Sequence, residues 1–166
     1  FTVVLNSEPT SDVTISVATD DATEGTADVA SLTFTAGNWN MAQTVTVTGA
    51  DDMVQDGDIA YSIQLGAASS ADPNYAGVDA ADVSVSNTDD DAAGITVTPT
   101  AGLVTSEAGG TASFTVVLNS EPTSDVTISV ATDDATEGSA DVASLTFTAG
   151  NWNVAQTVTV TGADDM

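Results

Sequence analysis

Hydrophobic and polar side chains alternate along several short stretches of the chain. In residues 13–18, valine and isoleucine alternate with small or polar residues, and stretches 43–49, 61–65, 83–86 and 95–98 keep the same period of two. Such alternation places one face of a β-strand on a core and the other in water. No stretch keeps apolar residues at the helical spacing i, i+3, i+4 and i+7. The pattern therefore predicts an all-β protein.

Clusters of turn-forming residues separate these stretches. They occupy residues 6–12, 20–25, 36–40, 50–58 and 72–78 and are rich in Asp, Asn, Gly, Pro and Ser. Threonine is abundant between them, and β-branched residues suit a pleated, half-buried surface. About seven short strands in roughly a hundred residues are typical of an antiparallel two-sheet sandwich of immunoglobulin type.

The chain contains a long internal repeat. Residues 1–53 recur as residues 114–166, at an offset of 113 positions, and 51 of the 53 positions are identical. A period of this length favours tandem domains over a solenoid, whose turns hold about 20–50 residues. The two differences are Thr26 against Ser139 and Met41 against Val154.

The phase of the repeat can be placed in the acidic seam at residues 87–94 (NTDDDAAG), between two strand-like stretches. With the boundary there, residues 1–92 are predicted to be the C-terminal part of one repeat unit, without its first strand. Residues 93–166 are predicted to be the N-terminal part of the next unit, without its last two strands. Open sheet edges in that second unit invite pairing with another chain, so we expect it to be disordered or to exchange strands with another copy.

The charge of the chain excludes several functions. The 166 residues include 25 acidic side chains and no Lys, Arg, His or Cys, which gives a formal charge of −25. No side chain can neutralise phosphate or anionic lipid, so we expect no nucleic-acid binding and no direct membrane binding. Most general bases and nucleophiles are missing, so we expect no enzyme activity. The sequence contains no run of about 18 apolar residues, so it predicts no membrane-spanning helix.

The carboxylates gather in the predicted loops. Close carboxylates repel by about 1 kcal/mol per pair even in water, and no cationic side chain offsets this. Flexible loops with hard oxygen ligands favour Ca²⁺ over Mg²⁺ or soft metals, and the lack of His and Cys disfavours Zn²⁺. The alternative is that these loops are simply solvated and keep the protein soluble. Residues 50–58 lack the spacing of an EF-hand loop.

Four segments are distinctive in their order and spacing along the repeat unit. They are 104–118 (VTSEAGGTASFTVVL), 17–38 (VATDDATEGTADVASLTFTAGN), 45–65 (VTVTGADDMVQDGDIAYSIQL) and 83–94 (VSVSNTDDDAAG). Together they resemble the Calx-beta family, calcium-binding immunoglobulin-like sandwiches of sodium–calcium exchangers and large bacterial surface proteins. The near-identical tandem units also resemble the repeat arrays of RTX-type bacterial adhesins. The resemblance implies an immunoglobulin-like (Calx-beta-like) antiparallel β-sandwich in a tandem repeat.

The resemblance further implies Ca²⁺ ligands wherever positions match. Glu107 matches the glutamate after the first strand, and Val54 would offer a backbone carbonyl. Ala-Asp-Val at 27–29 stands where the family has Gly-Asp-Tyr, and Asp56 stands where it has Glu. The first repeat unit retains most of the set, so we expect a well-occupied cluster there and a poor one in the second. The implied ligands are Asp28, Asp51, Asp52, Val54, Asp56, Asp89, Asp90, Asp91, Glu107, Asp141, Asp164 and Asp165.

These features predict a structural spacer of an extracellular adhesin on a bacterial cell surface, stiffened by Ca²⁺ near the joints between repeats. Its partners would be the neighbouring repeats of the same chain. One alternative is a Ca²⁺-dependent module that binds a glycan or a protein through an exposed aromatic or polar patch; another is a calcium sensor. Trp39 and Trp152, in the two NWN turns, are predicted to pack on the sandwich rather than to stack on a sugar.

Overall fold

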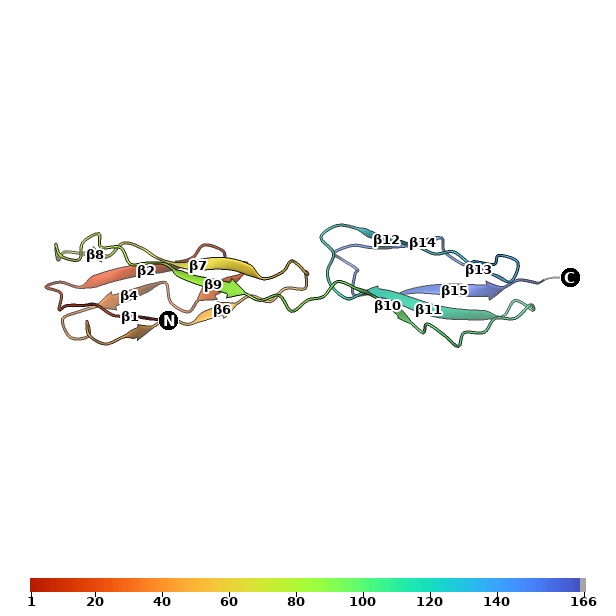
Figure 1. The fold of residues 1–166 in the computed structure, drawn as a ribbon, viewed down its shortest axis with the longest axis horizontal. Helices are drawn as coiled ribbons and strands as arrows, with labels where there is room; N and C mark the ends of the chain where they lie inside the picture. The colour runs from red at the N-terminus through yellow and green to blue at the C-terminus, as the bar shows by residue number, and fades with distance from the viewer. Residues whose placement is uncertain (165–166) are drawn as a thin grey trace. The chain divides into compact units, whose positions relative to one another are not determined.

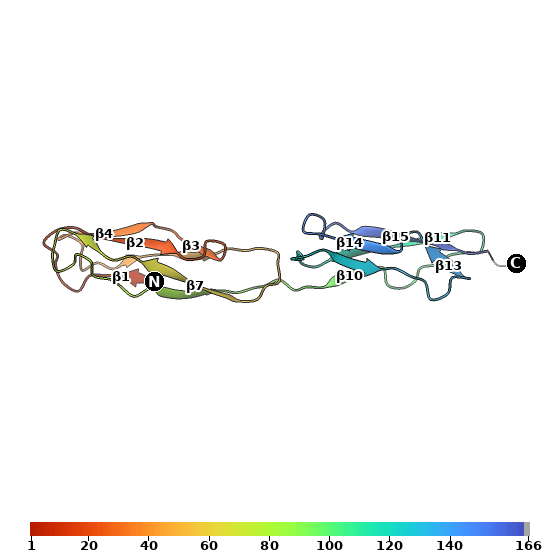
Figure 2. The same ribbon diagram turned by 90° about the horizontal axis from the view of Figure 1, so that it is seen from above.

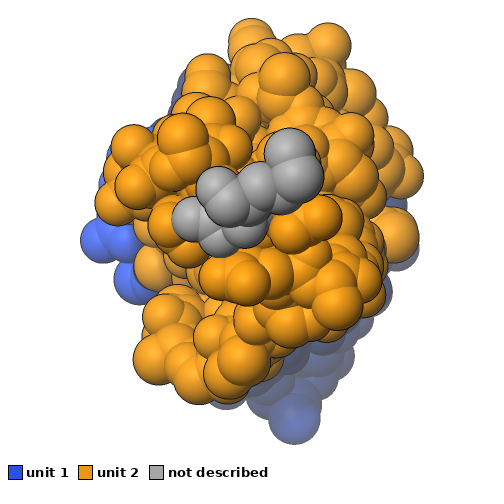
Figure 3. Space-filling model, turned by 90° about the vertical axis from the view of Figure 1, so that its right-hand side faces the viewer, with its two compact units in different colours: residues 1–52, 56–89 blue, residues 53–55, 90–166 orange. Residues whose placement is uncertain are grey.

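The computed structural model describes residues 1–164, which divide between two compact units (Figures 1 and 3). Unit 1 comprises residues 1–52 and 56–89, and unit 2 comprises residues 53–55 and the chain from Asp90 onward. Every strand pair in the described residues is antiparallel, and no helix forms there. The prediction of an antiparallel all-β, sandwich-like protein is therefore confirmed. Within residues 1–164 there is no apolar helix of membrane-spanning length.

Unit 1 is built from β1 (Thr2–Val3), β2 (Val13–Thr19), β3 (Gly25–Ala27), β4 (Ser31–Phe34), β5 (Gln43–Thr44), β6 (Val47–Gly49), β7 (Ile59–Leu65), β8 (Ser69–Ser70) and β9 (Val83–Asn87). Its main sheet has the order β4-β2-β7-β9, and β8 also pairs with β2. Two short pairs, β1–β5 and β3–β6, complete the unit. Figure 2 shows the same strands from above.

The core of unit 1 follows the alternation read from the sequence. Along β2 the inward residues Val13, Ile15 and Val17 are 0%, 5% and 5% exposed, while the residues between them are more open. Phe34 on β4 and Ile63 on β7 are completely buried in the same cluster. The pleat of each strand therefore directs every second side chain into one apolar core.

Each NWN turn is closed by its first asparagine, and its tryptophan packs on the core of its unit. Asn38 Oδ1 accepts hydrogen bonds from Thr35 N (2.6 Å) and Thr35 Oγ1 (3.2 Å), which closes the turn after β4. Trp39 packs against the core of unit 1, and Trp152 packs against that of unit 2. The prediction that both tryptophans pack on the sandwich is confirmed.

Unit 2 is built from β10 (Ile95–Thr98), β11 (Thr111–Leu118), β12 (Val126–Ser129), β13 (Gly138–Ala140), β14 (Ser144–Phe147) and β15 (Gln156–Gly162). Its larger sheet has the order β10-β11-β15-β13, and β12 pairs with β14 in a second, two-stranded sheet. The core cluster of its described residues contains Val116, Leu118, Leu145, Phe147 and Val158. These strands form within a single chain, and strand exchange with another copy stays a prediction.

A buried carboxylate holds two loops of unit 1 together. Asp72 is 1% exposed, and its Oδ2 accepts a hydrogen bond from Thr10 N (2.8 Å). Its Oδ1 accepts hydrogen bonds from Asn74 N (2.9 Å) and Asn74 Nδ2 (3.1 Å). Nearby, Tyr75 Oη donates to Ser7 O at 2.6 Å. The carboxylate replaces its lost water with donors from the protein, as burial of a charge requires.

The hydrogen bonds from the Thr10 and Asn74 backbones hold the pKa of Asp72 below its ordinary value. A depressed folded-state pKa contributes stability that is present above the unfolded value, near pH 4, and is lost as pH falls through the folded value. We therefore expect Asp72→Asn to lower the melting midpoint at pH 7. Below pH 4 the difference from the parent chain should shrink, because the parent carboxyl also becomes neutral.

Thermal melts at pH 7 and pH 3 check this, with Asp79→Asn as the matched control because Asp79 is an exposed carboxylate close by in the chain. The control should melt like the parent chain at pH 7. Equal midpoints for Asp72→Asn and Asp79→Asn at pH 7 would contradict the role given to Asp72.

Candidate metal centre

Three segments of unit 1 meet at one end of the β3–β6 ladder. The ladder closes with Gly25 opposite Gly49, and just beyond it Ala50 N donates to Glu24 O at 2.9 Å. Asn87, the last residue of β9, donates from Nδ2 to Ala50 O (2.6 Å) and to Glu24 Oε2 (3.3 Å). The carboxylate of Glu24 is therefore held beside the segment that leads directly into Asp51 and Asp52.

A second contact ties the acidic loop to the end of β9. Gly57 N donates to Asp89 Oδ2 at 2.7 Å, and Asp89 N donates to Asp58 Oδ1 at 3.1 Å. Gly57 has a φ of 85°, a left-handed conformation that favours glycine. The loop thus turns so that two carboxylates, Asp58 and Asp89, lie next to each other without a cationic side chain between them.

Asp20 is a further ordered carboxylate of unit 1. Its Oδ1 accepts from Ser62 N and its Oδ2 accepts from Ser62 Oγ, both at 2.7 Å. These bonds, the hydroxyl bond above all, lower the pKa of Asp20. Asp20 stays ionised across neutral pH, but its oxygens already serve the junction between β2 and β7.

The structure separates Asp28 from this end. Asp28 N donates to Thr46 O, and Thr46 N donates to Asp28 Oδ1, both at 2.9 Å. Asp28 therefore lies at the opposite end of the three-residue β3–β6 ladder from Glu24, about 13 Å away at the usual rise per residue. Asp141 makes the same pair of bonds with Thr159 in unit 2. Asp28 is therefore not brought together with Asp51 and Asp52, which follow the ladder at its other end.

In unit 2 two glutamates line one surface depression, together with Ser106, Ala108 and Ala163. Glu107 lies in a tight turn in which Gly110 N donates to Ser106 O at 3.1 Å. Glu137 is the repeat of Glu24, and Ala163 N donates to its carbonyl oxygen at 3.0 Å. Asp164 follows Ala163 directly, so it continues the chain from the rim of this depression. Asp165 lies outside the described residues.

The remaining predicted ligands divide between the two units. Asp51, Asp52 and Asp56 are exposed residues of unit 1. Val54, Asp90 and Asp91 are assigned to unit 2, and of these Val54 and Asp91 are half-buried. Among residues 1–164, no three carboxylates converge closely enough to hold one metal ion. What the structure provides is loop ends that carry acids from separate segments in each unit.

Some acidic side chains are committed to their own turns. Asp134 Oδ1 accepts hydrogen bonds from Thr136 N (3.0 Å) and Thr136 Oγ1 (2.5 Å), and these bonds lower the pKa of Asp134. Asp21 makes the same two bonds with Thr23 in unit 1. Such local caps are a common use of aspartate in turns, so these two residues are structural.

No protein-family model matches the chain, and neither a curated protein nor a solved structure gives a significant match.

Glu24 and Asp58 stand among the acids of the predicted loops, but the sequence did not predict them, Asn87 or Glu137 as candidate site residues. A signal for two of them was available, because Glu24 directly precedes a short strand and recurs 113 positions later as Glu137. Asn87 carries no charge and gave no such signal. Its role depends on the pairing of β9 with β7, which places Asn87 opposite Ile59.

Proposed function

We propose that this chain is part of a tandem array of immunoglobulin-like, Calx-beta-like units that serves as a spacer in a large extracellular adhesin of a bacterial cell surface. In this proposal Ca²⁺ binds to the acidic loop ends of each unit and stiffens the array near the joints between repeats. The chain itself catalyses no reaction. Its partners are the neighbouring repeats.

One observation carries the proposal: the same acidic loop end is built twice. Glu24 and Ala50 are joined backbone to backbone at 2.9 Å, and their repeats Glu137 and Ala163 are joined at 3.0 Å. In each case an aspartate follows in the chain. A feature preserved through near-identical units suits a role that every link of an array performs.

Electrostatics favours a bound cation at such an end. The chain has no basic side chain, so each pair of close carboxylates raises the free energy of the folded state by about 1 kcal/mol at contact in water, and by more when half-buried. Carboxylates, backbone carbonyls and amides are the ligands that Ca²⁺ takes in flexible loops, six to eight at a time. Water completes a shell where the protein offers fewer oxygens.

The packing of the tryptophans favours a spacer over a glycan-binding module. Trp39 and Trp152 both pack on the core of their own unit. Part of each ring is therefore committed to the core, which leaves a smaller aromatic surface for a sugar ring.

Calcium is expected to raise the thermal stability of the chain. A ligand that binds only the folded state adds about 2.7 kcal/mol at a hundredfold excess over its Kd. For a unit of this size that corresponds to a rise in the melting midpoint of about 11–22 °C. Melts in EDTA, in Ca²⁺ and in the same concentration of Mg²⁺ measure it, and Mg²⁺ should give the smaller shift because it dehydrates reluctantly.

Two variants locate the effect within unit 1. Glu24→Gln removes a carboxylate from the loop end and should reduce the Ca²⁺-induced shift. Glu8→Gln removes one from the exposed turn at residues 6–12 and should leave the shift unchanged. The proposal would be abandoned if the parent chain melted at the same temperature in Ca²⁺ and in EDTA.

A further inference from the structure

The acidic loop of unit 1 contains the one Asp-Gly pair of the sequence, Asp56–Gly57, between β6 and β7. Both residues are exposed, and a Cβ built at Gly57 would meet no heavy atom within 4 Å. In an Asp-Gly pair the next backbone nitrogen reaches the side-chain carboxyl most easily, because glycine has no side chain to shield that nitrogen. The pair is therefore a candidate for a covalent change of its own backbone.

The reaction that such a pair undergoes needs only water. Gly57 N attacks Asp56 Cγ, an N–C bond forms, and a C–O bond of the carboxyl breaks as water leaves with the proton of the nitrogen. Water then opens the resulting five-membered imide at one of its two carbonyls. Opening at Cγ restores aspartate, whereas opening at the main-chain carbonyl gives isoaspartate, whose backbone runs through Cβ and Cγ. The composition is unchanged, and the backbone becomes one carbon atom longer.

The attacking nitrogen is engaged in a hydrogen bond in unit 1. Gly57 N donates to Asp89 Oδ2 at 2.7 Å, the short distance of a bond to an ionised carboxylate. Asp89 N in turn donates to Asp58 Oδ1 at 3.1 Å. Two bonds therefore tie residues 57 and 58 to the chain just after β9, and an attack on Asp56 must break the first of them.

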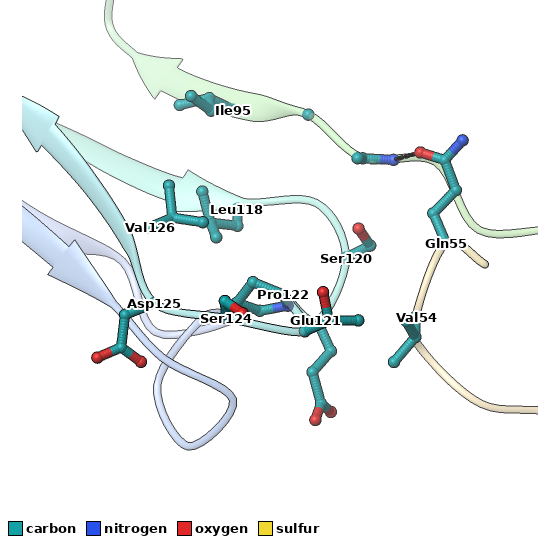
Figure 4. Close-up of a pocket in the computed structure, with 13 residues that line it drawn as sticks. Val54, Gln55, Ile95, Leu118, Ser120, Glu121, Pro122, Ser124, Asp125 and Val126 are labelled. Carbon is teal, nitrogen blue, oxygen red and sulfur yellow. Dashed lines mark hydrogen bonds between the residues drawn. The ribbon is translucent and has the colours of Figure 1, made fainter.

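The chain on the other side of Asp56 is also held. Gln55 belongs to unit 2, where its Oε1 accepts a hydrogen bond from Ala93 N at 2.7 Å (Figure 4). Two residues earlier, Met53 O accepts from Glu121 N at 2.6 Å. Asp56 therefore lies between two anchored stretches of chain, and a rotation about its main-chain bonds that brings Cγ to Gly57 N displaces one of them.

Charge adds to this restraint. The nitrogen loses its proton during the attack, so negative charge develops on it. Asp89 Oδ2 lies 2.7 Å from Gly57 N, Asp58 is the next residue, and the sequence contains no Lys, Arg or His to offset their charges. Like charges at such distances repel, and more strongly where solvent is partly excluded. The carboxylate that accepts the hydrogen bond therefore raises the barrier to attack.

We propose that Asp56–Gly57 is a site of spontaneous isomerisation to isoaspartate and that Asp89 protects it while unit 1 is folded. The protection comes from the hydrogen bond to Gly57 N and from the charge of the Asp89 carboxylate. A longer backbone at residue 56 shifts Gly57 relative to Asp89. Each event therefore weakens the contact between the loop and the chain just after β9.

The test compares the folded chain with a synthetic peptide of residues 50–60, both kept at physiological temperature and neutral pH in EDTA. A protein isoaspartyl methyltransferase counts the product by transfer of a labelled methyl group from S-adenosylmethionine. We expect isoaspartate to form at least about tenfold more slowly in the folded chain than in the peptide, because a hydrogen bond to a charged group must be lost. Equal rates in the chain and the peptide would overturn the proposal.

Asp89→Ala removes the acceptor and should raise the rate in the intact chain by about fivefold or more. Asp79→Ala is the matched control, because it removes the same charge from an exposed position of unit 1 and leaves the bond to Gly57 in place. The control should isomerise at the rate of the parent chain. A rate for Asp89→Ala equal to that of the parent would overturn the proposal.

A second variant covers a loss of folding. Trp39 fluorescence in a Trp152→Phe background reports whether unit 1 stays folded, since Trp39 packs on its core. Asp89→Asn keeps an oxygen that can accept the bond and removes only the charge, so its rate should fall between those of the parent and Asp89→Ala. If Asp89→Ala unfolds unit 1, an Asp89→Asn rate equal to that of the parent would overturn the proposal.

Two further measurements locate the reaction at Asp56. Asp-N protease does not cut before isoaspartate, so the missed cut before residue 56 should grow with the methylation signal. Asp56→Glu keeps the charge but requires a six-membered ring, which closes far more slowly, so the variant should lose the signal. A signal that persists in Asp56→Glu would overturn the assignment. Because calcium is absent throughout, the outcome is independent of whether the loop ends bind Ca²⁺.

Discussion

Phe34→Ala is expected to lower the free energy of unfolding of unit 1 by about 3–5 kcal/mol. Phe34 is 0% exposed and lies in the cluster that joins the main sheet to the two short strand pairs. Its removal loses the transfer free energy of the ring and leaves a cavity that the short strands cannot close. A domain of this size has roughly 5–10 kcal/mol of stability in all, so the loss is a large share of it.

Urea unfolding followed by Trp39 fluorescence in a Trp152→Phe background measures this loss, since Trp39 packs on the same core. Phe147→Ala is the matched variant, because Phe147 repeats Phe34 and is also 0% exposed. The described residues of unit 2 form a smaller buried cluster, so the same truncation should leave that unit unfolded without denaturant. A loss below about 1 kcal/mol for Phe34→Ala would mean that the ring is not part of a close-packed core.

Ile63→Asp in the intact chain is expected to cost unit 1 more than about 4 kcal/mol. Ile63 is 0% exposed, and the change both truncates a buried side chain and places a carboxylate where no cationic side chain exists to pair with it. The substituted residue also lies in the register that joins β7 to β2 and β9. Unit 1 should therefore unfold at much lower urea concentrations.

The neighbouring change Gln64→Asp adds the same charge on the exposed face of β7 and should cost less than about 1 kcal/mol. Comparing the two variants by Trp39 fluorescence separates burial from net charge, which is identical in both. If both variants lost the same stability, charge repulsion rather than burial would control the fold.

Much of the fold could be predicted because the alternation of apolar and polar residues indicates a half-buried strand. The stretches at 13–18, 61–65 and 83–86 lie in strands that turn alternate residues inward, and the turn at 36–40 forms where Gly and Asn cluster. Residues 95–98 also form a strand, but all four are exposed, so the predicted half-buried alternation is wrong there. These elements depend on local alternation and on turn chemistry, both of which are written in neighbouring residues. The immunoglobulin-like topology, the repeat phase and Ca²⁺ binding stay predictions.

The candidate site was less accessible to sequence reasoning. The sequence shows which loops are rich in acidic residues, but strand pairing decides which of these loops lie next to each other. The β3–β6 register holds Glu24 beside Ala50 and places Asp28 at the other end of the ladder. Asn87 reaches Ala50 and Glu24 only because β9 pairs with β7. None of these contacts is encoded by residues close together in the chain.

The two copies of one sequence separate local from long-range causes. In both, SLTF forms a four-residue strand with the same burial pattern, and the asparagine of the NWN turn closes the turn with the same bonds, so the side chains of these segments suffice. QTVTVTG, however, is one strand in β15 and two in β5 and β6, and VTISVAT is longer in β2 than in β12. A strand persists only where a neighbouring strand satisfies its N–H and C=O groups, and that neighbouring strand lies far away in the sequence.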